Sequence, residues 1–151
     1  MKTKIISKIL LSLGLVFVLG SAITQVYSED ENLPIVSIHS TGDVTRGQTG
    51  SFVLAMKPAL APFGGSYVNF SVSGTAIQGV DYVALVSPAH IGQSGYGAIL
   101  VKTLPDPRGS ADRQAYSVVV TLKPGPGYAI DAASSSAKMM IKPSNVLPCC
   151  Q

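Results

Sequence analysis

The chain has 151 residues, of which 46% are hydrophobic and 13% charged, with 15 glycines and 10 prolines. The length fits one domain, the low charge excludes a solvated helical bundle or coiled coil, and the apolar content excludes a disordered chain. Lys2, Lys4 and Lys8 lie in the first eight positions, and the eight basic residues that follow balance the eight acidic ones. Without net charge, the rest of the chain has no electrostatic reason to bind nucleic acid or an anionic membrane.

The N-terminal 28 residues have the pattern of a secretory signal peptide. The three lysines precede a mostly apolar stretch at 9–22, which is short for a membrane-spanning helix. Small residues offer two cleavage sites, after Ala22 or after Ser28, and we favour the second, which makes Glu29 the first residue of the exported protein. We therefore predict a secreted, periplasmic or cell-surface protein with no membrane span after cleavage.

From Pro34 onward, hydrophobic residues recur at every second position, as is typical of half-buried strands. The pattern predicts strands at 36–39, 52–57, 68–73, 82–85, 89–91, 99–102, 116–123 and 137–142. Clusters of glycine and proline separate these segments, and none shows the 3.6-residue period of a helix of ten or more residues. We expect an all-β, immunoglobulin-like sandwich of about seven strands in two sheets.

The predicted organisation has four parts. They are a signal peptide at 1–28, a short acidic linker at 29–33, the β-sandwich at 34–143 and a flexible tail at 144–151. The tail holds the two cysteines of the chain, Cys149 and Cys150, outside the sandwich. They could form a strained ring between neighbours, make a disulfide that tethers the domain to another copy or protein, or remain free thiols.

Three segments resemble the Calx-β domain family. Residues 72–82 (VSGTAIQGVDY) resemble the family pattern G-T-A-x-x-G-x-D-Y. Residues 118–122 (VVVTL), with the Gly-Pro-Gly-Tyr turn at 125–128, resemble the family's penultimate strand and the turn after it. Residues 137–141 resemble its last strand, and 91–93 resemble its I-x-x-G-Q segment less closely. The resemblance covers about 34–142 and implies a β-sandwich of the kind that recurs in large surface and transport proteins.

Much of this motif also has a structural explanation. Gly74 and Gly79 permit tight turns that would strain other residues. Tyr82 and Tyr128 can bury their rings while each hydroxyl group finds a backbone partner. Asp81, at the junction of a loop and a strand, can accept hydrogen bonds from backbone amides or bind a metal ion.

The resemblance implies a calcium site at one end of the sandwich, built from carboxylates of four segments. The Glu-Gly pair of the family falls here on Arg46-Gly47, and the aspartate of D-Y is kept as Asp81. The acidic loop falls on 106–113, where it keeps Asp106 and Asp112 but also holds Arg108 and Arg113. The terminal acidic run becomes 142–145, which contains Lys142 and no carboxylate.

This pattern argues against tight calcium binding. Calcium takes six to eight oxygen ligands, several of them charged, and the family's set of carboxylates is reduced here. We expect a built-in cation, Arg46 or Lys142, to replace the ion by pairing with Asp81 or Asp106. The alternative is a weak calcium site that uses Asp81, Asp106 and Asp112.

We therefore predict a non-catalytic module for adhesion, structural assembly or protein–protein binding. The sequence shows no nucleophile elbow, phosphate-binding loop or zinc-binding helix motif, so we expect no enzyme activity. The expected partner is another exported or surface protein, or a second copy of the chain. We expect no cofactor, with calcium as the alternative.

Overall fold

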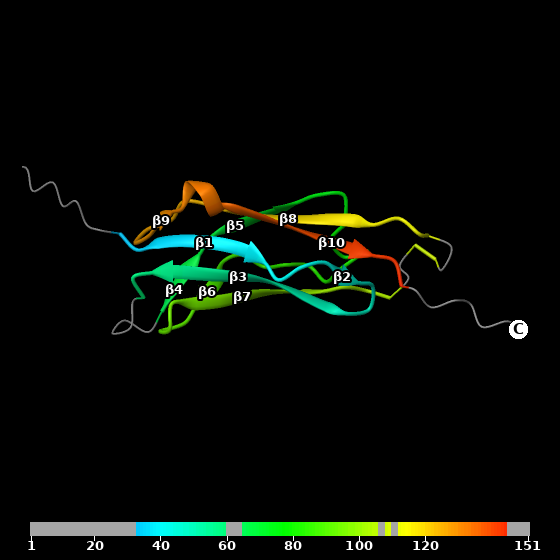
Figure 1. The fold of residues 1–151 in the computed structure, drawn as a ribbon, viewed down its shortest axis with the longest axis horizontal. Coiled ribbons are helices and arrows are strands. Elements are labelled where there is room, and N and C mark those ends of the chain that lie inside the picture. The colour runs from blue at the N-terminus through cyan, green and yellow to red at the C-terminus, as the bar shows by residue number, and fades with distance from the viewer. Residues whose placement is uncertain (1–32, 60–64, 106–107, 110–111, 145–151) are drawn as a thin grey trace, which may run out of the picture. The chain divides into compact units, whose positions relative to one another are not determined.

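The computed structural model describes residues 33–59, 65–105, 108–109 and 112–144. These residues form an all-β sandwich whose strands run along the long axis of the molecule (Figure 1). The fold class predicted from the period-two pattern is therefore confirmed. The predicted signal peptide, Asp106, Cys149 and Cys150 lie outside the described residues.

Two four-stranded sheets make up the sandwich, and a two-stranded sheet accompanies them. Sheet A has the order β7 (Tyr96–Lys102), β3 (Thr49–Lys57), β1 (Ile35–Ser40) and β9 (Ala129–Ile130). Sheet B has the order β2 (Val44–Thr45), β10 (Ser136–Lys142), β8 (Tyr116–Leu122) and β5 (Phe70–Ser73). The third sheet pairs β4 (Ser66–Val68) with β6 (Ala89–Ile91).

Most neighbouring strands are antiparallel, and the pairs β1–β9 and β2–β10 are parallel. A single turn of 3₁₀-helix, η2 (Ala132–Ser134), separates β9 from β10. Among the described residues, no helix has the length and apolar character needed to cross a membrane.

The core lies between the two large sheets because alternate side chains of each strand point inward. In sheet A, the register sets Val36 opposite Met56 and Ile38 opposite Leu54, and all four side chains are buried. Sheet B contributes its own buried hydrophobic residues, which are Val44, Phe70, Val118, Val120, Leu122, Met139 and Ile141. The hydrophobic pattern in the sequence thus marks the face of each strand that packs on the other sheet.

Two of the predicted strands differ from the structure. The segment 82–85 is not a strand, because Tyr82 makes only isolated bridges, to Gln78 and to Thr103. The segment 68–73 is divided at Asn69 into β4 and β5, which belong to different sheets. The backbone N–H of Asn69 donates to the Tyr128 hydroxyl group at 3.0 Å, so a side chain replaces a strand partner at this point.

The glycines and the second tyrosine of the family-like motifs have the expected structural roles. Gly74 has φ +125°, and a Cβ atom there would collide with the carbonyl oxygen of Ser117 on β8. Gly79 has φ +81°, a left-handed conformation that favours glycine. Tyr128 is buried, and its hydroxyl group donates to the Lys123 carbonyl oxygen at 2.7 Å. These residues build turns and corners of the sandwich whatever its function.

Candidate functional site

Asp81 is a buried carboxylate at one end of the sandwich, with 1% of its surface exposed. It lies in a turn in which its own N–H donates to the Ile77 carbonyl oxygen at 2.8 Å. The backbone N–H of Ile77 in turn donates to Asp81 Oδ2 at 2.7 Å. The Asp81 carbonyl oxygen accepts from Leu104 N, just past β7, at 2.9 Å. The turn therefore holds the carboxylate in a fixed position beside sheet A.

Arg108 binds this carboxylate with two parallel hydrogen bonds. Its Nε donates to Asp81 Oδ1 at 2.8 Å and its Nη2 donates to Asp81 Oδ2 at 2.7 Å. The hydrogen bonds from Arg108 hold the pKa of Asp81 below its ordinary value, against the opposing effect of burial. The same pairing raises the pKa of Arg108. Both carboxylate oxygens are therefore engaged by a cation that the chain itself supplies.

A second ion pair joins Arg46, which follows β2, to Asp112. The Arg46 side chain is 1% exposed and that of Asp112 is 14% exposed. Arg46 Nη2 donates to Asp112 Oδ2 at 3.0 Å, and Nη1 donates to the Asp112 carbonyl oxygen at 3.2 Å. Arg46 Nε is buried and has no hydrogen-bond partner among the described residues.

Asp112 is also held by two neighbours in the chain. The backbone N–H of Gln114 donates to Asp112 Oδ1 at 2.9 Å, and the Tyr116 hydroxyl group donates to Asp112 Oδ2 at 3.0 Å. The bond from Gln114 is the largest cause of a lowered pKa at Asp112, followed by the bonds from Arg46 and Tyr116. The Asp112 carboxylate therefore accepts hydrogen bonds from a backbone amide, a guanidinium group and a phenol group.

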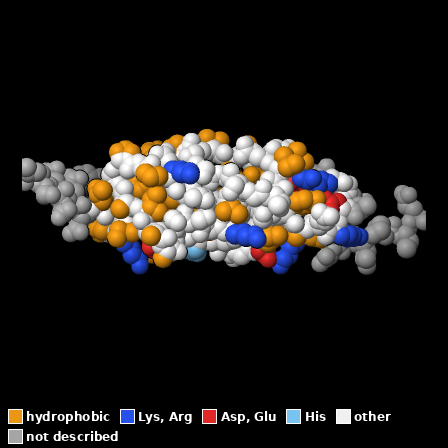
Figure 2. Space-filling view, turned by 90° about the horizontal axis from the view of Figure 1, so that it is seen from above, with side chains coloured by type: hydrophobic (Ala, Val, Ile, Leu, Met, Phe, Trp, Pro, Cys, Tyr) orange, Lys and Arg blue, Asp and Glu red, His pale blue; other side chains and the backbone are white. Residues whose placement is uncertain are grey.

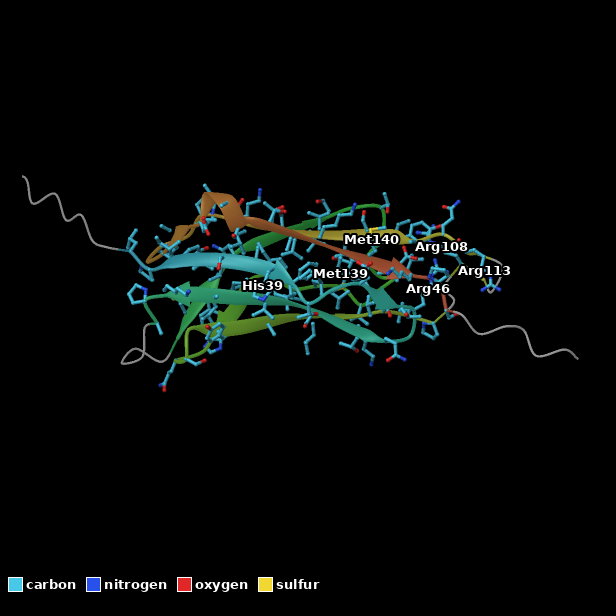
Figure 3. All side chains as sticks on the ribbon, viewed as in Figure 1. His39, Arg46, Arg108, Arg113, Met139 and Met140 are labelled. Atoms are coloured by element: carbon cyan, nitrogen blue, oxygen red, sulfur yellow. The ribbon has the colours of Figure 1, made fainter. Side chains whose placement is uncertain are left out.

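Tyr116, the first residue of β8, lies against both guanidinium groups. The Cζ atom of Arg108 is 4.2 Å from the centre of the Tyr116 ring, and that of Arg46 is 5.4 Å away. Burial, and then the bond to Asp112, raises the pKa of Tyr116. We call these five residues, Arg46, Asp81, Arg108, Asp112 and Tyr116, the arginine–aspartate cluster. Figure 3 shows its two arginines at one end of the sandwich.

A third ion pair lies nearby but is exposed to solvent. Lys142 Nζ is 2.8 Å from Asp43 Oδ2, and the two side chains are 57% and 39% exposed. Asp43 Oδ1 accepts a hydrogen bond from the backbone N–H of Met140 at 3.1 Å. The bond from Lys142 is the largest cause of a lowered pKa at Asp43. On the face shown in Figure 2, blue and red side chains lie next to each other at the end of the molecule where β10 ends.

The ion pairs in the structure join other partners than those expected from the sequence. We expected Arg46 or Lys142 to pair with Asp81 or Asp106, but Asp81 is bound by Arg108. Arg46 instead pairs with Asp112, and Lys142 pairs with Asp43. Asp106 lies outside the described residues, so any pairing of it stays a prediction.

Two members of the cluster were not singled out from the sequence. In the sequence, Arg108 is a basic residue within the acidic loop at 106–113, and Tyr116 is the first residue of a predicted strand. The sequence feature that could have identified Arg108 as a site residue is its position in the same loop as Asp106 and Asp112. Spacing along the chain could not show that this loop turns back to Asp81, which is 27 positions away.

Of the three carboxylates predicted as calcium ligands, the two that the structure describes belong to different ion pairs. Asp81 belongs to one pair and Asp112 to the other. Among the residues that the structure describes, no group of three or more histidine, cysteine, aspartate or glutamate side chains is close enough to hold a metal ion. Calcium at Asp81 would have to displace two hydrogen bonds from Arg108 and one from Ile77.

Comparison of the chain with known protein families and with curated proteins finds no match to either. The functional interpretation therefore depends on the geometry of the cluster and on the resemblance of the three sequence segments.

Proposed function

We propose that this protein is a Calx-β-like, non-catalytic exported module for adhesion, structural assembly or protein–protein binding, in which arginines replace calcium. The observation that carries the proposal is the Arg108–Asp81 pair. A buried aspartate of the family-like D-Y motif has both oxygens bound by a guanidinium group. The module would keep its shape at any calcium concentration.

Charge balance supports this proposal. Carboxylates that lie close together repel one another, and a bound cation normally removes that repulsion. Here Arg108 and Arg46 supply two positive charges next to Asp81 and Asp112. The guanidinium group also offers planar, paired donors that match a carboxylate, which a lysine cannot do.

The same pairing fits a structural role better than a catalytic one. A general base or nucleophile needs a free carboxylate or another activated group that can reach a substrate. In the arginine–aspartate cluster, each carboxylate oxygen accepts at least one hydrogen bond from the chain. The cluster therefore stabilises one end of the fold and leaves the surfaces of the sheets for contact with partners.

Thermal unfolding of the purified protein with millimolar calcium and then with a chelator tests the proposal. A site with a Kd of about 10 μM would stabilise the fold by roughly 2.7 kcal/mol at 1 mM calcium. In a domain of this size that effect would raise the Tm by several degrees. We expect the two Tm values to agree within error, and a clear rise with calcium would overturn the arginine-replacement proposal.

Two matched variants sharpen this test. Arg108→Gln removes the charge that covers Asp81, whereas Lys142→Gln removes a charge from the exposed pair. We expect Arg108→Gln to lower the Tm and to make it respond to calcium, because the carboxylate then lacks its internal cation. We expect Lys142→Gln to stay insensitive to calcium. Equal responses of the two variants would show that Arg108 does not occupy the place of an ion.

A further inference from the structure

We propose that Tyr116 couples the two arginine–aspartate pairs, so that they form and break as one unit. This inference concerns how one end of the sandwich opens. It is independent of the proposed function, because it requires neither a metal ion nor a partner.

The contacts of Tyr116 connect both pairs. Its hydroxyl group donates to Asp112 Oδ2, the same oxygen that accepts from Arg46 Nη2, and both distances are 3.0 Å. Its ring packs against the guanidinium group of Arg108, whose Cζ is 4.2 Å from the ring centre. Arg108 is itself bound to Asp81. One side chain thus links Asp81 and its arginine to Asp112 and its arginine.

The connection has a physical consequence for stability. Arg108 is held by Asp81 on one side and by the aromatic ring on the other, and a guanidinium group is attracted to a ring face. If Arg108 moves away, the ring loses this contact and its hydroxyl group is less firmly held against Asp112. Hydrogen-bonded charged networks of this kind are worth more than the sum of their single bonds. Loss of one pair should therefore weaken the other.

Two backbone amides report separately on the two pairs. The N–H of Ile77 donates to Asp81, and the N–H of Gln114 donates to Asp112. An amide exchanges its hydrogen with solvent when its own hydrogen bond opens, so each reports the opening of one carboxylate. Ile77 contacts only the Asp81 carboxylate and Gln114 only that of Asp112 in these bonds. A variant of one pair that speeds exchange at the amide of the other pair therefore shows a cross-effect between the pairs.

Hydrogen exchange of these amides, followed by NMR in the full exported chain, tests the coupling. We expect Arg108→Gln to speed exchange at Ile77 and also at Gln114, by about tenfold at each. We expect Arg46→Gln to speed exchange at Gln114 and also at Ile77. If each variant affects only the amide of its own pair, the two pairs are independent and the proposal is overturned.

Variants of Tyr116 separate the coupling from general loosening of the fold. Tyr116→Leu removes the aromatic ring and should abolish the cross-effects, whereas Tyr116→Phe keeps the ring and should preserve part of them. Exchange at Leu54, a buried residue of β3, serves as the reference for global unfolding. If cross-effects persist unchanged in Tyr116→Leu, the coupling does not pass through this ring. If Arg108→Gln fails to fold, Arg108→Lys keeps the charge but removes the paired hydrogen bonds, and the same cross-effect is expected.

Discussion

The two arginine–aspartate pairs, each with one buried member, and the exposed Lys142–Asp43 pair lie at the same end of the sandwich but differ in geometry. Arg108 binds Asp81 through two parallel hydrogen bonds, and that carboxylate is 1% exposed. Lys142 reaches Asp43 through one flexible ammonium group, and its side chain is 57% exposed. Both carboxylates have a lowered pKa. The direction of a pKa shift thus does not tell a fixed ion pair from a surface contact.

The difference shows what burial does to an ion pair. An exposed pair exchanges its partner for water at little cost, and salt screens it. A buried carboxylate that loses its partner has no water to replace it, so the free energy of unfolding falls steeply. The arginine–aspartate cluster should therefore dominate the electrostatic stability of this end.

Acidification should have the largest effect, because it removes the charge from both aspartates of the cluster, the buried Asp81 and the partly buried Asp112, together. The pKa values of Asp81 and Asp112 lie below their ordinary value of 3.8 in the folded protein. Their contribution to the free energy of unfolding is therefore fully present above that value and is lost as the pH falls through the lower, folded pKa values. We expect little change between roughly pH 7 and 5, and a steep loss below about pH 4.

Denaturant unfolding at a series of pH values checks this expectation. The variant Asp81→Asn lacks one of the titrating groups and should lose stability less steeply below about pH 4 than the natural chain. Parallel curves for the two proteins would show that Asp81 does not contribute to acid sensitivity.

The next largest effect is expected from Asp81→Asn at neutral pH. The variant keeps the size of the side chain but removes the charge that Arg108 binds. We expect the free energy of unfolding to fall by about 3 kcal/mol, the lower end of the range for breaking a buried pair, since Arg108 is partly exposed. Asp131→Asn is a suitable control, because that partly exposed side chain accepts a hydrogen bond from Ala133 N at the start of η2 and belongs to no ion pair among the described residues. A loss no larger than that of the control would refute the importance of this pair.

The smallest effect is expected from Lys142→Ala. The side chain is exposed, and its removal leaves Asp43 free to bind water. We expect a Tm close to that of the natural chain. We also expect 1 M salt to reduce the difference between the two proteins further, because salt screens exposed charges. A change as large as that of Asp81→Asn would mean that exposure is a poor guide to the contribution of an ion pair.

The fold class was predictable because each strand carries its own hydrophobic pattern, which can be recognised from neighbouring residues in the sequence. In strands such as β3 and β8, the large side chains that are buried recur at every second position, and this period of two identifies the inward face. The prediction failed at 82–85, where the backbone of 81–83 bonds to residues 102–104, at and just past the end of β7, and forms no strand. It also missed the division at Asn69, because the hydrogen bond from Tyr128 comes from a distant part of the chain.

The candidate site was predictable only in part. The sequence indicated Asp81 and Asp112 as acids and Arg46 as a cation of this site. The partners expected from it, Asp81 or Asp106 for Arg46 or Lys142, differ from those in the structure, because each of the five members of the cluster lies in a loop or at the end of a strand. In such segments the course of the backbone, and not a repeating pattern, decides which side chains meet. For this reason the sequence did not identify Arg108 and Tyr116 as members of the site.

The sequence by itself determined the class of fold, the inward faces of most strands and the acidic and basic residues available at one end. These properties follow from hydrophobic periodicity and from the identity of single residues. Only the tertiary structure decided that Arg108 binds Asp81, that Arg46 binds Asp112 and that Tyr116 touches both pairs. An ion pair forms where two charged groups are brought within hydrogen-bonding distance, and in this cluster that distance is set by the course of the loops at one end of the sandwich.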